Sequence, residues 1–416
     1  MGALKVERRS VQRSFLKFFG PGMIVSVAYM DPGNFGTDIS AGALHNYDLL
    51  WVVWMANLMA MFLQYLSGKI GIATGRSMPE LMREKLGGRA RVISYWLASE
   101  LFAIATDLAE FLGVALAIHL LFDIPLFWAA TIASFDVVAI FLLTGGKLRW
   151  IERAITSLVS VIGLGYVFEI LLVRPDIVTI VYHSVSPRLS QETAPLVVGI
   201  IGATVMPHAL ALHSWLTKNK IEEGGIEKRR ILLKYHLIDN VVNLSLAGLV
   251  NAAILIMAAA AFYATGNPVA TIEEAYRTLM PLFGYLASFV FAITLLASGL
   301  ASSTTGIFAG QALMEGLLGA KVNPWLRRIV LRVINVVPTL LAITWGLNPL
   351  AILVYSQVML SILIPLPLIP ILYFSSKKDL MGEFVNRRLT NTIAVSFTMM
   401  ILFLNAYLLI EEFHFA

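Results

Sequence analysis

Long apolar runs alternate with short polar connections along the whole chain. A helix needs about 20 apolar residues to cross the hydrocarbon core of a bilayer. Eleven runs reach that length, near residues 14–43, 49–74, 93–122, 125–144, 154–173, 194–217, 236–263, 283–317, 329–346, 350–374 and 391–410. Glycine or proline marks most connections. The pattern predicts an all-α membrane protein of eleven transmembrane helices, with residues 1–416 forming a single transmembrane domain.

Composition supports the bilayer as the solvent of this chain. Hydrophobic residues make up 58% of the 416 residues and charged residues 14%, whereas soluble domains carry about 25% charged residues. The chain has no cysteine, which excludes disulfides, iron–sulfur clusters, cysteine-bound zinc and thiol catalysis. Any metal site must therefore use oxygen, nitrogen or thioether ligands.

The basic residues predict how the helices are oriented. Most of the 31 lysines and arginines, Arg327 and Arg328 among them, are assigned to connections on the same side as the N-terminus, and only Arg174, Arg188 and Arg277 to the other side. Cytoplasmic connections of membrane proteins collect Lys and Arg. We therefore expect a multi-pass protein of the cell inner (cytoplasmic) membrane, with the N-terminus in the cytoplasm and the C-terminus outside. This asymmetry also accounts for the net charge of +5 without a nucleic-acid partner.

Two of the apolar runs violate the rules of helix formation near their middle. The first contains Asp31-Pro32-Gly33-Asn34 and the sixth contains Met206-Pro207-His208. Proline removes a backbone donor and clashes with the preceding turn, and a carboxylate at that depth costs about 2.5 to 3.5 kcal/mol on insertion scales. Broken helices at corresponding places of two halves indicate a transporter built from inverted repeats. We place these repeats at about 14–173 and 194–374, with 391–410 as an extra helix.

The residues beside the breaks form a mixed set of possible metal ligands. They are the carboxylate of Asp31, the amide oxygen of Asn34, the thioether of Met206 and the carbonyls of Ala28 and Ala203. Calcium and magnesium prefer shells of oxygen alone, whereas a thioether favours softer ions. The set predicts a passing divalent transition metal, Mn²⁺ or Fe²⁺. Gln357 in the tenth run could complete the shell, although hydrogen bonding between helices explains it more simply.

A second group of polar residues lies in other runs. Asp107 and Glu110 are three residues apart and share a helix face, and Arg332 is their candidate countercharge. Such groups build proton relays in transporters, although a structural ion pair between helices is the competing interpretation. His208 is a candidate for proton handling because it adjoins the second break, and His213 is as readily a hydrogen-bonded core residue. Glu100, Asp136 and Glu169 are further acids to which the pattern assigns no role.

Four segments together resemble the Nramp (natural resistance-associated macrophage protein) divalent-metal transporters. They are A-Y-M-D-P-G-N-F in the first run, A-T-D-L-A-E-F-L-G at 105–113, G-A-T-V-M-P-H at 202–208 with L-H-S after it, and S-Q-V-M-L-S at 356–361. The likeness extends from about Phe19 to Asn386.

The resemblance implies a LeuT-like fold of five plus five helices and proton-coupled uptake of Mn²⁺ or Fe²⁺. It implies that Asp31, Asn34, Met206 and the carbonyls of Ala28 and Ala203 hold the metal, with Gln357 joining in some states. It assigns Asp107, Glu110, His208, His213 and Arg332 to the proton route. One departure is Leu331-Arg332, where many bacterial members have two adjacent arginines.

Two other functions remain open at this point. A carrier of the same fold could move an organic solute together with sodium. A membrane-embedded metal enzyme is the second possibility, weakened by the lack of any H-E-x-x-H motif. In the favoured interpretation the protein is a monomer and not an enzyme; it carries no permanent cofactor, and its partners are a divalent metal ion, protons and the lipid bilayer.

Overall fold

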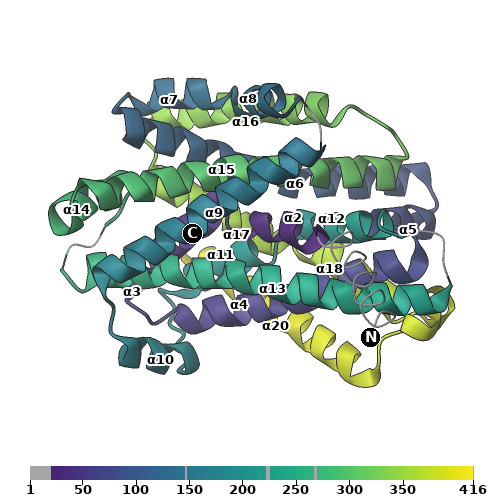
Figure 1. The fold of residues 1–416 in the computed structure, drawn as a ribbon. Coiled ribbons are helices and arrows are strands. Elements are labelled where there is room, and N and C mark those ends of the chain that lie inside the picture. Colours follow the sequence, from purple (N-terminus) through teal and green to yellow (C-terminus); the bar gives the residue numbers. More distant parts are fainter. Residues whose placement is uncertain (1–19, 146–147, 222–224, 267–268, 416) are drawn as a thin grey trace, which may run out of the picture.

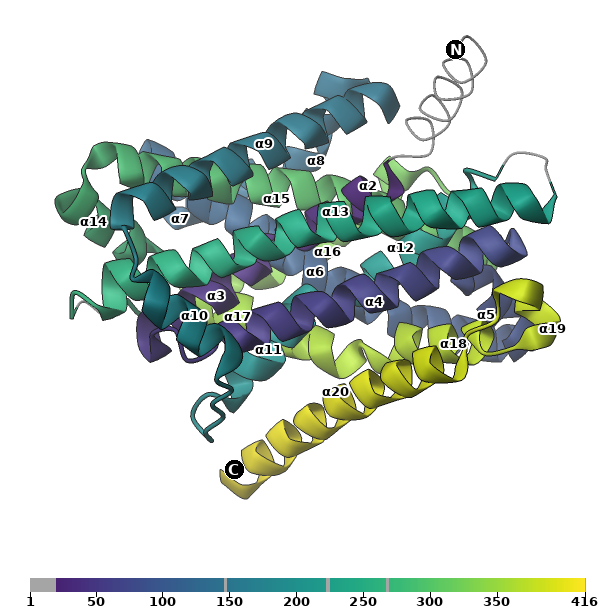
Figure 2. The same ribbon diagram turned by 60° about the horizontal axis from the view of Figure 1, so that its bottom comes forward.

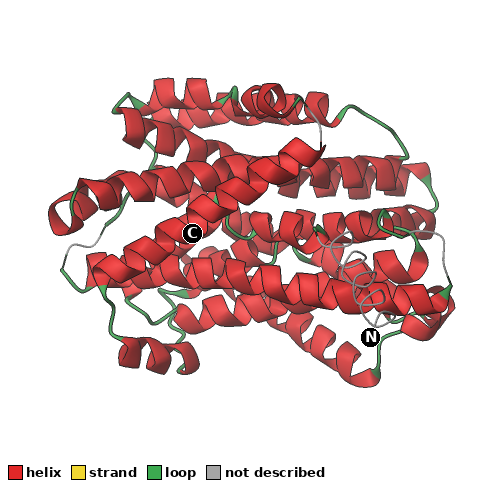
Figure 3. Ribbon diagram, viewed as in Figure 1, coloured by secondary structure: helices red, strands yellow, loops and turns green. Residues whose placement is uncertain are grey.

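A computed structural model describes residues 20–145, 148–221, 225–266 and 269–415. The described residues form helices joined by short loops, with no strand among them (Figure 3). The first part of the chain forms α2 (Pro21–Ala28), α3 (Pro32–His45), α4 (Leu50–Thr74), α5 (Met78–Leu86), α6 (Arg89–Phe122), α7 (Leu126–Ala133), α8 (Asp136–Thr144), α9 (Leu148–Val173) and α10 (Ile177–Val185). Residues 14–19 of the first predicted run, and the basic residues before them, lie outside the described residues.

The remaining helices follow the same pattern of long rods and short pieces. They are α11 (Ala194–Thr204), α12 (Pro207–Lys218), α13 (Ile226–Ala258), α14 (Ile272–Phe283), α15 (Tyr285–Leu313), α16 (Pro324–Thr344), α17 (Pro349–Leu363), α18 (Pro365–Ser375), α19 (Lys378–Met381) and α20 (Arg388–Phe415). Single π-helical turns, η1 (Ala259–Tyr263) and η2 (Met314–Leu318), extend α13 and α15, and a 3-10 turn, η3 (Gly382–Phe384), follows α19.

Both predicted helix breaks are confirmed. α2 ends at Ala28 and α3 begins at Pro32, with Asp31 as its N-cap residue. α11 ends at Thr204 and α12 begins at Pro207, with Met206 as its N-cap residue. In each case proline stands at the first helical position, where its missing N–H group costs nothing.

Two further interruptions were not predicted. The fourth run is split between α7 and α8 at Ser134 and Phe135, and the tenth is split between α17 and α18 beside Pro365. The second of these has the usual cause, because proline cannot donate to the preceding turn. The sequence of the fourth run carries no such signal.

The broken helices lie in the middle of the bundle. Figures 1 and 2 show α2, α11 and α12 surrounded by longer rods, with α9 and α20 along opposite edges in Figure 2. α4 packs on α12 and α13, α6 and α9 pack on α15, and α11 packs on α17. α20 lies against α11 and α18. The central position of the two broken helices explains why nearly every side chain of α11 and of the first two turns of α12 is buried.

Eight helical segments among the described residues are long and apolar enough to cross a membrane. They are Leu50–Thr74, Arg89–Phe122, Arg153–Val173, Ala194–Lys218, Ile226–Tyr263, Tyr285–Leu318, Pro349–Ser375 and Arg388–Ile410. The other three predicted runs contain the halves α2 and α3, the short pair α7 and α8, and the arginine-bearing α16. Large apolar side chains such as Leu171 and Leu249 are exposed on the outer helices, as expected for surfaces that face lipid.

Candidate functional site

The first break leaves a backbone carbonyl group without its helical hydrogen bond, next to a carboxylate. The residue four positions after Ala28 is Pro32, so the Ala28 carbonyl has no helical N–H partner. Asp31 is completely buried, and its Oδ1 accepts hydrogen bonds from the backbone N of Asn34 at 2.9 Å and from Asn34 Nδ2 at 2.8 Å. Its Oδ2 has no hydrogen-bond partner. The break thus presents one unpartnered carboxylate oxygen in the interior.

The second break repeats this arrangement, with a thioether side chain in place of the carboxylate. Pro207 stands four residues after Ala203, so the Ala203 carbonyl also lacks its helical partner. Met206 occupies the extended turn between α11 and α12 and is completely buried. Both carbonyls named from the sequence are therefore released by the same cause, a proline four residues later.

The side chain of Asn34 connects the two breaks. Its Nδ2 donates to Asp31 Oδ1 and, at 3.1 Å, to the carbonyl oxygen of Ala203. Its Oδ1 accepts from Asn251 Nδ2 at 3.1 Å and from Thr204 Oγ1 at 3.4 Å. An amide NH₂ group therefore lies between an acidic oxygen and a carbonyl oxygen, which is the position that a cation would take. The amide oxygen of Asn34, predicted as a metal ligand, faces Asn251 and Thr204 in this state. The amide group must rotate by half a turn to direct this oxygen to the point between Asp31 and the Ala203 carbonyl.

Gln357 of α17 lies against both breaks. A Cβ atom added to Gly33 would overlap the Gln357 amide, and one added to Gly202 would overlap the Gln357 carbonyl oxygen. The side chain is completely buried and its Oε1 has no hydrogen-bond partner. Glycine at these two positions lets α17 approach closely, which places a further neutral oxygen donor at the junction.

The donors at this junction are unlike a resident metal centre. Among the described residues there is no group of three or more His, Asp or Glu side chains that could hold a metal. The junction instead offers one carboxylate with neutral oxygen and sulfur groups. Such a set favours a divalent transition metal ion over calcium or magnesium, without the several anionic ligands that would hold the ion permanently.

A separate ion-pair network joins α6 and α16. Arg328 Nη2 lies 2.8 Å from Asp107 Oδ1 and also pairs with Glu110. Arg332, one turn later, contacts the same Asp107 oxygen at 3.4 Å. Asn335 Nδ2 donates to the other oxygen of Asp107 at 2.7 Å. All of these side chains are buried, so each charge depends on its partner.

Arg332 connects this network to Asp136 of α8. Its Nη2 donates to Asp136 Oδ2 at 2.8 Å and to Ser303 Oγ at 3.2 Å. Ser303 Oγ in turn donates to Asp136 at 3.3 Å. Asp136, which the sequence left without a role, is therefore a member of the network.

The two candidate histidines lie in different surroundings. His208 Nδ1 is 3.2 Å from the hydroxyl of Thr106, the residue before Asp107, so it borders the ion-pair network. His213 Nδ1 is 2.9 Å from Gln64 Oε1, and Gln64 Nε2 donates to the Tyr29 hydroxyl at 2.6 Å. His213 thus connects to the first break through α4 and is not bonded to the acids of α6.

The sequence and the fold of this chain both match known proteins. The Nramp sequence model, "Natural resistance-associated macrophage protein-like", matches residues 22–411. The chain belongs to the Nramp family.

Curated relatives and solved structures of this family cover nearly the whole chain. Divalent metal cation transporter MntH of Deinococcus radiodurans is 44% identical over 402 residues, covering 96% of this chain and 91% of the relative. MntH of Caldanaerobacter subterraneus is 42% identical over 398 residues, with 95% and 93% covered. A crystal structure of the Eremococcus coleocola manganese transporter superposes with a TM-score of 0.85 at 31% identity, covering 95% of this chain and 86% of the other. These relatives are named as transporters and not as enzymes.

A more distant structure shares the fold alone. MHP1, a nucleobase-cation-symport-1 family transporter, superposes with a TM-score of 0.53 at 14% identity, covering 86% of this chain and 78% of the other. The overall fold of this chain is therefore found in a transporter of another family as well.

One assignment made from the sequence of this Nramp chain was wrong. Arg327 and Arg328 were counted in a cytoplasmic connection, but both are buried, and Arg327 pairs with Glu100 at 2.5 Å. The apolar pattern predicts a helix only from residue 329, whereas α16 begins at Pro324. The spacing of the arginines could have indicated that Arg328 belongs to the helix, because Arg328 and Arg332 are four residues apart and share a helix face.

Asn251 is a second residue of the candidate site that the sequence pattern does not single out. It lies on α13, and its Nδ2 donates to the Tyr29 carbonyl in the first break at 2.9 Å as well as to Asn34. The only signal was a single amide inside an otherwise apolar stretch. Such amides usually bond between helices, and the sequence alone does not say to which helix.

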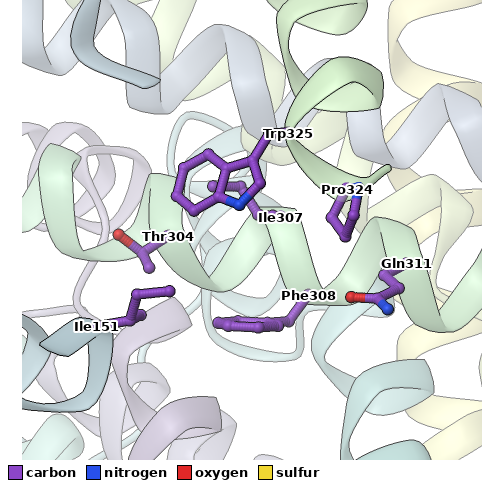
Figure 4. Close-up of a pocket in the computed structure, with 7 residues that line it drawn as sticks. All are labelled: Ile151, Thr304, Ile307, Phe308, Gln311, Pro324 and Trp325. Carbon is purple, nitrogen blue, oxygen red and sulfur yellow. The ribbon is translucent and has the colours of Figure 1, made fainter. Parts of the chain in front are cut away.

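The candidate metal site is closed to solvent in this state. A cavity of about 230 Å³ lies between α15, α16 and the start of α9, lined by residues that include Thr304, Gln311 and Trp325. Figure 4 shows these side chains around an open space beside α15. None of the predicted site residues lines it. Asp31 and Met206 are themselves completely buried, so an ion can reach them only if the surrounding groups move.

Proposed function

We propose that this protein is a proton-coupled secondary transporter that imports divalent transition metal ions, Mn²⁺ or Fe²⁺, by alternating access. The observation that carries the proposal is the junction of two broken helices through Asn34, which touches both Asp31 and the Ala203 carbonyl. Membership of the Nramp family and the names of the MntH relatives support it.

The metal ion binds between the breaks. Asp31 supplies the charge, Met206 supplies the sulfur, and the carbonyls of Ala28 and Ala203 supply neutral oxygens. Asn34 turns its amide oxygen to the ion as its NH₂ group leaves Asp31. Gln357 joins in some states. A shell with one anionic ligand lets the ion leave again, which a carrier requires.

Protons move through a separate set of groups. Asp107, Glu110 and Arg332 form the part within the ion-pair network, His208 borders that network, and His213 leads to the first break through Gln64. The acids of α6 are bonded to arginines and not to the residues of the junction. This arrangement supports separate routes for the protons and the metal ion.

The membrane arrangement follows from the same proposal. The eleven predicted segments cross the inner (cytoplasmic) membrane as two inverted repeats, about 14–173 and 194–374, with 391–410 as an extra helix and the protein acting as a monomer. The N-terminus lies in the cytoplasm and the C-terminus outside. The asymmetric distribution of basic residues supports this orientation.

The direct test is uptake of radiolabelled Mn²⁺ into proteoliposomes by an Asp31→Ala variant. We expect uptake to fall to background, because the junction then has no anionic ligand. Asp379→Asn is the matched control, since it removes an exposed acid and should leave uptake unchanged. Uptake by Asp31→Ala at the wild-type rate would refute the proposal. Acidification recorded with a trapped pH dye tests proton coupling in the same vesicles.

A further inference from the structure

Two buried acids lie outside both the metal junction and the ion-pair network. Glu169 of α9 and Asp38 of α3 are 1% exposed, and all four of their carboxylate oxygens lack a hydrogen-bond partner. Buried polar groups in native proteins are nearly always bonded, so unpartnered ones require an explanation. These two acids have no part in the function proposed above.

The acids are linked through one aromatic residue and lead toward the first break. Tyr166, three residues before Glu169 on α9, lies within electrostatic range of both Glu169 and Asp38. Its ring packs edge-on against Phe35 of α3, with 5.5 Å between centroids. Asp38 follows Asp31 by seven residues, about two helical turns, so the two acids share a face of the same helix and lie within electrostatic range of one another. Glu169, Asp38 and Asp31 therefore lie along two helices that meet at the contact between Tyr166 and Phe35.

No cation of the described chain compensates Glu169. α9 packs mainly on α2, α8, α13 and α15, and Tyr166 also contacts α3 through Phe35. α2 and α15 carry no Asp, Glu, Lys, Arg or His. The last charged residue of α13 is Asp239, more than a turn before the apolar residues Leu246 and Leu249 that lie near Tyr166. On α8, Asp136 is bonded to Arg332.

The surroundings of Asp38 are equally free of countercharge. α3 packs on α6, α11, α13, α15, α17 and η1. α11, α17 and η1 carry no charged residue, and their tyrosines Tyr263 and Tyr355 are exposed. The acids of α6 are held by Arg327 and Arg328. Asp31, itself an acid, is the charge that reaches Asp38.

An ionised carboxylate without donors or countercharge is too costly in an apolar interior. Neutralisation requires a bound proton or a bound cation. The two acids have too few neighbours for a metal shell, because the described residues contain no group of three or more acidic or histidine side chains that could hold a metal ion. The neighbouring groove between α9 and α13 is lined by apolar side chains apart from the Tyr166 side chain, so it supplies no charged partner.

We propose that Glu169 and Asp38 form a second proton-binding site, separate from the α6–α16 network, which releases protons when a divalent cation binds at Asp31. The negative charge of Asp31 opposes ionisation of Asp38. A cation bound at Asp31 neutralises this charge, so Asp38 can lose its proton. The O–H bond of the carboxyl group breaks and water accepts the proton. Only the release of protons on metal binding rests on the proposed metal site at Asp31. The binding of protons by the two acids does not depend on that site.

Infrared spectroscopy of the full chain in lipid nanodiscs tests the protonation itself. A neutral carboxylic acid has a carbonyl stretch distinct from the bands of a carboxylate. We expect the wild-type protein to show this band at neutral pH, and Glu169→Gln to lose part of it. Glu192→Gln is the matched control, since Glu192 is an exposed acid, and it should keep the whole band. A Glu169→Gln spectrum identical to that of the wild type overturns the proposal.

Labelling gives a second measurement that needs no variant. If Glu169→Gln does not fold, wild-type protein containing ¹³C-glutamate is compared with unlabelled protein. A neutral-acid band that shifts on labelling supports the proposal, and a neutral-acid region that does not shift contradicts it.

Proton release measures the link to the metal. Mn²⁺ is added to weakly buffered protein with an indicator dye, and bound Mn²⁺ is measured by calorimetry. The Glu169→Gln/Asp38→Asn double variant should release fewer protons per bound Mn²⁺ than the wild type or Glu192→Gln, and equal release contradicts the link. If wild-type protein binds no Mn²⁺, the proposed function fails, whereas the infrared band still decides whether the two acids hold protons.

Discussion

The break junction and the α6–α16 network solve the problem of buried charge in opposite ways. The network pairs Asp107, Glu110 and Asp136 with Arg328 and Arg332. The junction holds Asp31 with hydrogen bonds from Asn34 alone and leaves one oxygen unpartnered. A paired charge has no need of an external ion, whereas Asp31 lacks a cation of its own. This difference is the reason for proposing the metal site at the junction and not in the network.

The largest expected contrast concerns stability. Arg328→Met leaves Asp107 and Glu110 short of a buried countercharge, which should cost about 3–5 kcal/mol of unfolding free energy. Asp31→Asn removes an acid that has no ion-pair partner, and we expect a change of about 1 kcal/mol or less. Reversible unfolding in mixed detergent micelles measures both.

The control for the arginine variant is Arg76→Met, because Arg76 forms an exposed pair with Glu84 that is worth about 0–1 kcal/mol. If Arg328→Met were no more harmful than Arg76→Met, the distinction between the two regions would not hold.

A second prediction concerns the packing of the junction. Gly202→Ala places a methyl group against the backbone of Gln357 and Ser361, and such overpacking costs about 1–3 kcal/mol. Initial rates of Mn²⁺ uptake should fall roughly tenfold, since about 1.4 kcal/mol corresponds to a factor of ten. Gly163→Ala on α9 is the control, because its Cβ would meet no atom within 4 Å. Equal rates for the two variants would show that close approach of α17 has no importance for transport.

Selectivity should depend on the sulfur ligand. Met206→Ala removes the thioether and leaves an all-oxygen set, so Ca²⁺ should compete with Mn²⁺ about tenfold better. Competition is read as the Ca²⁺ concentration that halves Mn²⁺ uptake. Met257→Ala truncates an equally buried methionine on α13 and should leave this concentration unchanged. An unaltered value for Met206→Ala would remove the argument from sulfur.

The smallest effect lies outside the membrane, at the contact of α5 with α12. Burial opposes ionisation of Glu80, but donors from Lys218 and Ser77 outweigh it and hold the pKa of Glu80 below its usual value. A lowered pKa stabilises the fold above the unfolded-state pKa, and this stability is lost as the pH falls through the folded-state pKa.

Lys218→Met should therefore lower stability at neutral pH by about 1 kcal/mol or less and weaken its decline in acid. Thermal unfolding scans at neutral and acidic pH measure the difference. Arg230→Met, which disrupts a pair of half-exposed residues with Glu383, serves as the comparison. A pH profile identical to that of the wild type would contradict the assignment.

The sequence alone determined the features that arise from local backbone chemistry. Pro32 and Pro207 break their helices wherever the chain folds, because each lacks an N–H group for the carbonyl four residues earlier. Apolar run length located the long helices for a similar reason, since a lipid-exposed backbone must satisfy its own hydrogen bonds. Asp31 and Met206 could therefore be named as residues of the two breaks, and as candidate ligands, before any fold was known.

Tertiary structure alone decided which polar groups meet. Asn34 reaches the Ala203 carbonyl across 169 positions of sequence, and Arg328 reaches Glu110 across 218. Asp136 and Asn251 looked like isolated polar residues until packing placed Arg332 and Asn34 beside them. The same packing left Glu169 and Asp38 without partners. A side chain's own type fixes what it can bond, but only the arrangement of distant helices fixes whether a partner is there.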